Sequence, residues 1–294
     1  MEGRVFGDFE VIKKIGQGSF GEIFLGKNKN DGTPVAIKIE PKKSPKKVLN
    51  NDITFLTKAK DQKYIPKFYA SGSDEEYTWL AMEYLGPSLE HIIQKLPNKK
   101  ISKKCALTMA KYILYGIEAV HDLSYIHRDI KPGNVLLRHS RDAPIALIDY
   151  GLSKVYYDER AKMHLPPKPH CGFFGSLLYA SPNTHMRRDL ARRDDMFSWF
   201  YVLADLLTDN LPWSDNKNPQ EVLNIKAKYD VAPLIEMVPQ IEEIYKQIIN
   251  MQYVTKPDYE GFRKLLDEAI AACPDGNEFD WHPDIFNMDA APEV

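Results

Sequence analysis

Long apolar runs, closely spaced cysteines and a large excess of charge are all lacking from this 294-residue sequence. A membrane helix needs about 18 or more consecutive apolar residues, and no stretch approaches that length, so we expect no membrane contact. The N-terminal residues lack the apolar core of a secretory signal. The formal net charge of −2 argues against binding to nucleic acid through overall charge.

The three cysteines, Cys105, Cys171 and Cys273, are far apart and lack the spacing of a metal site. An odd number of scattered cysteines indicates free thiols in a reducing compartment. We therefore expect a cytoplasmic or nuclear protein, and we expect it to be a monomer.

One polar stretch carries most of the recognisable chemistry. Residues 126–134 read I-H-R-D-I-K-P-G-N, and Asp149-Tyr150-Gly151 follows fifteen residues after Asn134. The pattern is typical of the catalytic and metal-binding loops of protein kinases, and two unrelated polar turns would rarely reproduce it. Phosphoryl transfer needs a carboxylate that accepts the hydroxyl proton, a cation for the migrating phosphoryl group and oxygen ligands for magnesium. We assign these roles to Asp129, to Lys131, and to Asn134 and Asp149 together.

A glycine-rich stretch lies among three predicted antiparallel strands at residues 9–15, 23–25 and 35–39. Residues 16–21 read G-Q-G-S-F-G, a pattern that also occurs in dinucleotide-binding turns. Such a turn opens a helix, whereas here a strand follows, which favours a flap over the phosphates of ATP. We expect the nucleotide to contact Ile15, Gly16, Gly18, Ser19, Gly21, Ile23 and Ala36.

Lys38 ends a V-A-I-K strand and is expected to hold the α- and β-phosphates. Its partner should come from a helix predicted at residues 44–60, where Asp52 is the only acidic side chain. Asp52 is one methylene shorter than the usual Glu. Either the helix lies closer to the sheet, or the ion pair is looser or bridged by water.

The strand predicted at residues 77–84 leads into a Gly-Pro segment that is our candidate hinge. Adenine is expected to bind the backbone near Glu83 and Leu85, with Met82 lining the back of its pocket. For Met82, ordinary core packing is an equally good interpretation.

Helical periodicity dominates the rest of the chain, at residues 102–124, 194–208, 219–228, 240–251 and 258–272. We therefore expect an α+β, bilobal fold that forms a single domain over residues 1–294. Residues 1–84 would form a small antiparallel sheet lobe with one helix, and residues 85–274 a larger, mainly helical lobe. The acidic tail, residues 275–294, would either dock through Phe279, Trp281 and Phe286 or stay loose.

The segment from Lys154 to Gly175 contains no Ser or Thr. Our hypothesis is that this segment is ordered without Ser/Thr phosphorylation, so that Arg128 must be satisfied by another anion or a carboxylate. An enzyme that becomes active only after phosphorylation of Ser153 or Ser176 would contradict it. Tyr156 and Tyr157 remain open as acceptors.

With these residues in place, the chain resembles the casein kinase I superfamily over nearly its whole length. The resemblance rests on four signatures: L-G-P-S-L at 85–89, Y-A-S-P-N-T-H at 179–185, R-R-D-D at 192–195 with L-P-W at 211–213, and K-P-D-Y at 256–259 with F-D-W at 279–281. Some features lean toward the tau-tubulin-kinase-like branch and the L-G-P-S-L segment leans away from it, which leaves the branch open. The resemblance implies ATP, Mg²⁺ and protein substrates with Ser or Thr acceptors.

Three departures from the family pattern bear on function. Asp52 replaces Glu, Tyr150 replaces Phe, and Leu177-Leu178 stands where the family places a basic residue that binds acidic or phosphorylated substrates. Lys228 matches another basic position of that anion site, so a weakened site is expected. The alternative function is a pseudokinase scaffold that binds nucleotide and partner proteins without turnover.

Overall fold

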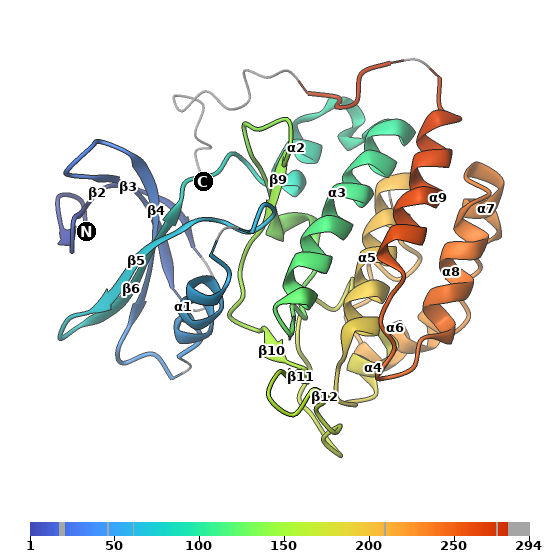
Figure 1. Ribbon diagram of the computed structural model, residues 1–294. Coiled ribbons are helices and arrows are strands. Elements are labelled where there is room, and N and C mark those ends of the chain that lie inside the picture. Colours follow the sequence, from blue (N-terminus) through green and yellow to red (C-terminus); the bar gives the residue numbers. More distant parts are fainter. Residues whose placement is uncertain (18–20, 46, 61, 209, 275, 282–294) are drawn as a thin grey trace. The chain divides into compact units, whose positions relative to one another are not determined.

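The computed structural model describes residues 1–281 except 18–20, 46, 61, 209 and 275, and these residues fall into two compact units (Figure 1). The first unit comprises Met1–Pro87 and Leu136–Ser153, and the second comprises Ser88–Val135 and residues 154–281. We predicted a boundary after Tyr84, and the first unit runs to Pro87 before the chain enters the second. That prediction placed residues 136–153 in the larger part, whereas the structure places them in the first unit.

The first unit is built on one antiparallel sheet with strand order β1-β2-β3-β4-β6-β5. Its strands are β1 (Val5–Phe6), β2 (Phe9–Gln17), β3 (Glu22–Asn28), β4 (Pro34–Pro41), β5 (Phe68–Ser73) and β6 (Tyr77–Glu83). Sequence alternation predicts β2, β3, β4 and β6 but not the short β1 or β5. β5 was missed because Ala, Ser and Gly give it little apolar alternation.

Helix α1 (Leu49–Lys58) packs on this sheet and buries Leu49, Phe55 and Leu56. It begins five residues later than predicted, because the chain around Ser44 forms a turn in which the Ser44 amide donates to the Pro41 carbonyl over 2.9 Å. The apolar periodicity that predicted the helix also predicted the face that it buries.

A short hairpin of β8 (Val135–Leu137) and β9 (Ile145–Leu147) explains why residues 136–153 lie in the first unit. The Gly86 amide donates to the Leu137 carbonyl over 2.9 Å, and the Leu137 amide donates to the Pro87 carbonyl over 3.0 Å. These long-range backbone bonds have no signature in sequence periodicity, so only the fold shows them.

The second unit is mainly helical, and α3 packs against both α5 and α9 in its core (Figure 1). Its α-helices are α2 (Leu89–Lys95), α3 (Lys103–Asp122), α4 (Pro182–His185), α5 (Arg192–Thr208), α6 (Pro219–Lys226), α7 (Ala232–Met237), α8 (Ile241–Asn250) and α9 (Tyr259–Ala271). Its remaining elements are η1 (Pro97–Lys99), η2 (Pro132–Asn134), and the strand pairs β7 (Tyr125–Ile126) with β10 (Lys154–Val155) and β11 (Tyr157–Asp158) with β12 (Met163–His164).

Buried aromatic side chains join the core helices of this unit. Trp199 of α5 is fully buried, and its indole Nε1 donates to the Ala110 carbonyl of α3 over 2.8 Å. The Trp199 ring lies 5.7 Å from the ring of Phe262 in α9. The three long periodic segments of the sequence thus form one core.

The described part of the acidic tail contacts α3. Asp280 Oδ1 accepts a hydrogen bond of 2.9 Å from the hydroxyl of Ser102, and that same hydroxyl caps α3 by accepting from the Cys105 amide. Glu278 accepts from the Tyr112 hydroxyl over 3.1 Å. Phe286, which we also expected to dock, lies outside the described residues.

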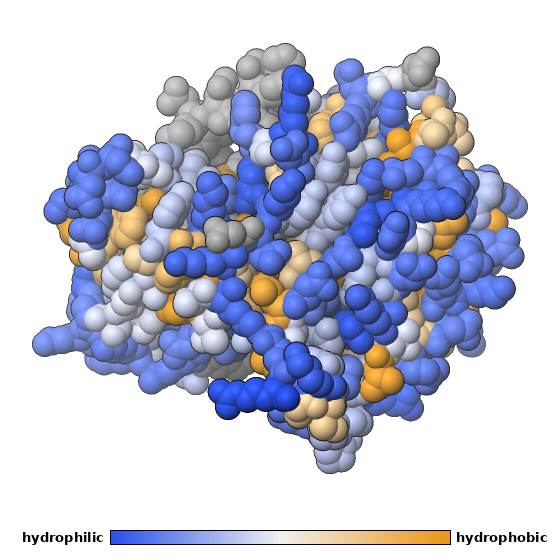
Figure 2. All heavy atoms as spheres, viewed as in Figure 1, coloured by the Kyte–Doolittle hydropathy of each residue, from blue (hydrophilic) through white to orange (hydrophobic). Residues whose placement is uncertain are grey.

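The face of the molecule drawn in Figure 2 is mostly hydrophilic, with apolar residues exposed singly or in small groups. Within the described chain, no helix has both the length and the apolar composition that a membrane crossing requires.

Candidate active site

Lys38, Asp52 and Asp149 meet in the first unit. The Lys38 ammonium on β4 lies 2.9 Å from Asp52 Oδ2 on α1 and 2.9 Å from Asp149 Oδ1. The Asp52 side chain is almost fully buried, whereas that of Asp149 is 47% exposed. The shorter carboxylate could have implied a closer helix, a looser ion pair or a bridging water. The structure shows direct contact between Asp52 and Lys38, with α1 packed on the sheet.

Charge pairing outweighs burial at Lys38. Burial alone would lower the pKa of Lys38, but the Asp52 and Asp149 carboxylates raise it above its usual range. Lys38 is therefore a fixed ammonium at neutral pH. A permanent cation on a strand beside an exposed carboxylate can bind phosphate oxygens.

Helix α1 also holds the turn that carries Asp149. The second Asp52 oxygen accepts from the Tyr150 amide over 2.7 Å, and the Asn51 side-chain amide donates to the Gly151 carbonyl over 2.8 Å. Asp149 itself has φ of 68°, in the left-handed region that non-glycine residues rarely adopt. Asp52 thus has a double role: it pairs with Lys38 and it fixes this strained turn.

Tyr150 carries a hydroxyl that Phe lacks, and a buried hydroxyl needs a hydrogen-bond partner. The side chain is 1% exposed, and its ring stacks on Phe55 of α1 with centroids 3.9 Å apart. The hydroxyl donates to the Leu147 carbonyl over 2.6 Å. The residue therefore packs as Phe would, and its hydroxyl group forms a hydrogen bond.

The described residues of the predicted phosphate flap lie on β2, on β3 and directly before β3. In the sheet register Gly16 lies opposite Ile23, and Ile23 lies opposite Lys38. Gly18 and Ser19 lie outside the described residues. At Gly21 a Cβ would collide with the Ile39 carbonyl, so glycine is required there by the sheet as well. Ile15 is half-buried on β2.

The predicted adenine-contacting residues lie on β4, on β6 and just beyond it. Ala36 pairs with Met82 across these strands, and Leu85 follows β6 and is buried. The Glu83 carboxylate binds Arg138, with contacts of 2.9 Å to Nε and 2.8 Å to Nη2. Its amide donates to the Lys67 carbonyl over 2.9 Å, so neither group is available to a ligand.

A separate pocket of 660 Å³ lies beside this Glu83–Arg138 pair. The described residues that line it come from the segment between α1 and β5, the start of β5, the end of β6 and the β8–β9 turn, and they include neither Lys38 nor Asp149. This pocket is therefore not the expected nucleotide site.

The predicted catalytic loop forms a compact network in the second unit. Lys131 Nζ lies 2.7 Å from Asp129 Oδ2, and the Asn134 side-chain amide donates to the Asp129 carbonyl over 2.8 Å and to Oδ2 over 3.2 Å. The other carboxylate oxygen accepts from both the amide and the hydroxyl of Ser176, each over 2.9 Å. Ser176 was considered only as a phosphorylation site, and no local signal placed it against Asp129.

The buried carboxylate of Asp195 stabilises the backbone of this loop. It is 1% exposed, and it accepts from the His127 amide over 2.7 Å and from the Arg128 amide over 2.8 Å. Its Oδ2 also lies 2.9 Å from Nε2 of His121. These bonds stabilise Arg128 at φ of 70°. In the sequence, residues 192–195 stand out only as a family signature, and no local pattern indicates this role of Asp195.

Arg128 finds an aromatic neighbour that was not expected. Its guanidinium lies 4.1 Å from the centre of the Phe174 ring, within cation–π distance. Burial lowers the pKa of Arg128, and the carboxylates of Asp195 and Asp189 act against that change. The expectation named only an anion or a carboxylate and overlooked the aromatic face.

Two potential acceptors in this region are not accessible. Tyr156 is 5% exposed and its hydroxyl donates to the His121 carbonyl over 2.9 Å, while Ser153 is 8% exposed. Tyr157 is half-buried and remains accessible.

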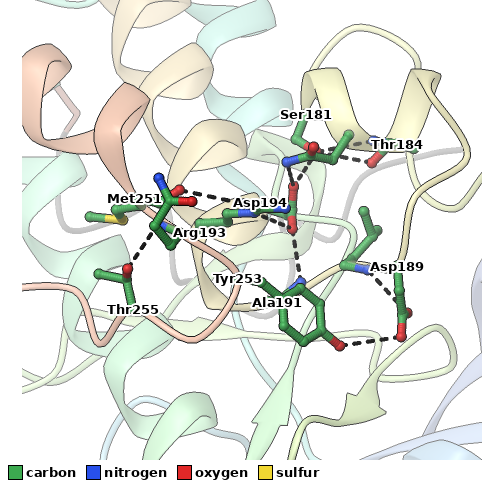
Figure 3. A network of polar contacts seen from close by, with 12 residues as sticks. Ser181, Thr184, Asp189, Ala191, Arg193, Asp194, Met251, Tyr253 and Thr255 are labelled. Carbon is green, nitrogen blue, oxygen red and sulfur yellow. Dashed lines mark hydrogen bonds and ion pairs between the residues drawn. The ribbon is translucent and has the colours of Figure 1, made fainter. Parts of the chain in front are cut away.

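Asp194 anchors the segment that follows Leu177-Leu178 (Figure 3). Its Oδ1 accepts from the Ser181 hydroxyl over 2.6 Å and from the Asn183 side-chain amide over 2.9 Å. Its Oδ2 accepts from the Ala191 amide over 2.8 Å. The Y-A-S-P-N-T-H signature and the R-R-D-D signature are thus two halves of one buried network.

Each unit carries one of the two predicted magnesium ligands. Asp149, in the first unit, has a carboxylate that is 47% exposed. The Asn134 side-chain nitrogen is committed to Asp129, which leaves its oxygen as a ligand. Mg²⁺ at nucleotide sites takes one or two protein oxygens together with phosphates and water. The described residues contain no group of three or more His, Cys, Asp or Glu side chains arranged for a metal.

Comparison with known proteins agrees with this geometry. Residues 9–274 match the protein kinase domain family. The chain is 34% identical over 280 residues to a Dictyostelium discoideum protein named as a probable serine/threonine-protein kinase, with 94% of this chain and 56% of the relative covered. It is 33% identical to casein kinase I homolog 3 of Schizosaccharomyces pombe and 35% identical to casein kinase I homolog 1 of Saccharomyces cerevisiae. In both comparisons 93% of this chain is covered, with 65% and 53% of the respective relatives. The chain thus spans between half and two-thirds of the length of these relatives.

We expect Asp52→Glu, which restores the family residue, to destabilise the protein. The 2.9 Å contact is already made, so an additional methylene in this buried site should cost about 1–3 kcal/mol of unfolding free energy. Asp52→Asn should cost a similar amount, about 2 kcal/mol, because it removes a charged hydrogen-bond partner. Denaturant unfolding measures both. A stabilising effect of Asp52→Glu would show that the helix is held too far from Lys38.

We expect Tyr150→Phe to lower the unfolding free energy by about 1 kcal/mol, because it leaves the Leu147 carbonyl without this donor. Tyr150→Ala should cost about 3–5 kcal/mol, because it also removes the ring that stacks on Phe55. Equal losses in the two variants, measured by denaturant titration, would contradict the stacking contribution.

Proposed function

Because this chain belongs to the protein kinase family and is casein kinase I-like within it, we propose that it transfers the γ-phosphoryl group of ATP to Ser and Thr hydroxyls of protein substrates. The observation that carries the proposal is the Asp129 network. One carboxylate oxygen of Asp129 pairs with the Lys131 ammonium, and the other accepts from the Ser176 hydroxyl. The buried Asp195 holds the loop that carries Asp129.

The proposed reaction assigns one task to each polar group. The substrate oxygen forms a bond to the γ-phosphorus, the bond from that phosphorus to the bridging oxygen of ADP breaks, and Asp129 takes the hydroxyl proton. Lys131 offsets charge on the migrating group. In protein kinases most of the catalysis comes from such positioning and charge stabilisation.

Nucleotide binding would draw on the first unit. Lys38, held as an ammonium by Asp52, would bind the α- and β-phosphates beneath the β2–β3 flap. Ile15, Ile23, Ala36, Met82 and Leu85 would surround the base. Asn134 and Asp149 would hold Mg²⁺, which supplies charge neutralisation at the phosphates when it is bound.

The grounds for a pseudokinase scaffold were Asp52 and Tyr150, and both side chains are accommodated. Asp52 reaches Lys38 directly, and Tyr150 keeps the aromatic packing and satisfies its hydroxyl. Turnover is therefore the better-supported proposal.

The neighbourhood of the acceptor favours uncharged substrates. Leu177 and Leu178 are half-buried and apolar, and Lys228 is an exposed lysine after α6. An exposed single lysine binds an anion weakly because water and salt screen it. The anion site near Lys228 is thus proposed to be weak.

We also propose a monomeric enzyme of the cytoplasm or nucleus that does not bind nucleic acid. The near-zero net charge and the three free cysteines support this proposal. Phe174 over Arg128 supports a segment that is ordered without Ser/Thr phosphorylation.

We expect magnesium-dependent transfer of labelled γ-phosphate from ATP to casein and to a Ser/Thr peptide library. Asp149→Asn should lower the rate by a factor of about 100 or more, because it removes a charged ligand from the metal. Asp215→Asn, an equivalent change at an exposed position, should leave the rate unchanged. Absence of transfer by the native chain, with ATP still bound, would favour the scaffold.

We expect a phosphoserine placed three residues before the acceptor to raise kcat/KM by no more than about twofold, because exposed single charges contribute little. Leu178→Arg should increase that gain by restoring a basic side chain. A gain in the native protein as large as in Leu178→Arg would refute the weak anion site.

A further inference from the structure

Lys226, the last residue of α6, has an ammonium group that is buried against residues 177–180, which we call the acceptor turn. The residue is 3% exposed. Its Nζ donates to the Leu177 carbonyl over 3.0 Å and to the Ala180 carbonyl over 2.7 Å. Neither the family signatures nor the catalytic set includes this lysine.

The surroundings of Lys226 show that the ammonium is held there at a cost. Nζ lies 4.8 Å from the centre of the Tyr201 ring and 5.1 Å from that of Trp213, and 3.4 Å from Nε2 of His185. Burial lowers the pKa of Lys226 to about 7. A charge taken out of water is costly unless hydrogen bonds and nearby dipoles compensate it. Here the compensation comes from two carbonyls and two aromatic faces.

A second donor acts on the same stretch of backbone. The Trp213 indole Nε1 donates to the Leu178 carbonyl over 2.8 Å. The carbonyls of Leu177, Leu178 and Ala180 therefore each accept a hydrogen bond from Lys226 or Trp213. The amides of Tyr179 and Ala180 donate to the Ser176 carbonyl over 3.1 and 2.9 Å, which closes the turn.

This turn is directly joined to the proposed base. Ser176 precedes Leu177 and binds Asp129 through both its amide and its hydroxyl. The substrate hydroxyl must approach Asp129, so residues 177–180 necessarily flank the acceptor. Their backbone position decides which surface the substrate meets.

We propose that Lys226 is a positioning residue for protein-substrate binding, which fixes the backbone of residues 177–180 so that Leu177 and Leu178 present an apolar surface beside the acceptor. The inference rests on the proposed kinase function. The apolar surface of Leu177 and Leu178 selects substrates with aliphatic rather than acidic residues next to the Ser or Thr.

The test compares the native chain with Lys226→Met, which keeps the length and packing of the side chain but removes the donor. We expect the peptide KM to rise about tenfold, as small misplacements of a binding surface do, while the KM for ATP stays unchanged. Selectivity for a Ser peptide with Leu on both sides over the same peptide with Glu should also fall. Lys217→Met, at an exposed position before α6, is the matched control and should behave as native.

A second measurement does not depend on turnover. Hydrogen exchange of the Tyr179 and Ala180 amides should be faster in Lys226→Met than in the native chain, with the core of α3 and α5 unchanged. Trp213→Phe removes the indole donor while keeping an aromatic ring, and it should give a smaller change in the same direction. It keeps the proposal testable if Lys226→Met does not fold.

Three outcomes separate the possibilities. A raised peptide KM together with faster exchange confined to this turn supports the positioning role. An unchanged peptide KM, or a lower kcat with faster exchange throughout the unit, overturns it and leaves Lys226 a structural residue. If the native chain transfers no phosphate but exchange still accelerates only at the turn, the proposed function fails while the backbone contact of Lys226 stands.

Discussion

The buried ion pair between Lys38 and Asp52 is the interaction on which the candidate site residues of the first unit depend. A buried ammonium and carboxylate are tolerable only together, because either alone would lose hydration without compensation. Asp52 also accepts from the Tyr150 amide, so the same carboxylate sets the turn that presents Asp149. One side chain on α1 therefore couples Lys38 to the turn that carries Asp149, and the packing of Phe55 against Tyr150 keeps that helix in place.

Buried carboxylates play the equivalent part in the second unit. Asp195 binds consecutive amides of the catalytic loop, and Asp194 binds the segment after the acceptor turn (Figure 3). Lys226 adds a buried amino group that donates to the carbonyls of Leu177 and Ala180, just before the segment that Asp194 binds. In each case a side chain with no part in the proposed chemistry binds backbone groups, and Asp194 and Asp195 also bind neighbouring side chains. Such contacts keep the reactive groups in place without contributing atoms to the reaction.

Strong local signals made much of the fold predictable. The alternation of β2 to β4 and the helical periodicity of α3, α5 and α9 identify their elements, because each element buries one face against the core of its own unit. Less was visible where tertiary contacts override local pattern. β5 has few apolar residues, α1 begins after a turn, and the β8–β9 hairpin lies in the first unit through backbone bonds to Gly86 and Pro87.

The sequence by itself determined the chemical groups of the candidate site, because the H-R-D-x-K-x-x-N and D-Y-G patterns fix residue type at short spacing. It also identified the problems that Asp52 and Tyr150 raise. Only the tertiary structure decided how they are solved, since a 2.9 Å ion pair and a hydroxyl–carbonyl bond depend on how closely α1 packs. The same holds for Phe174 over Arg128 and for Lys226 behind the acceptor turn. These partners are distant in sequence, and no periodicity links residues that meet only in the folded chain.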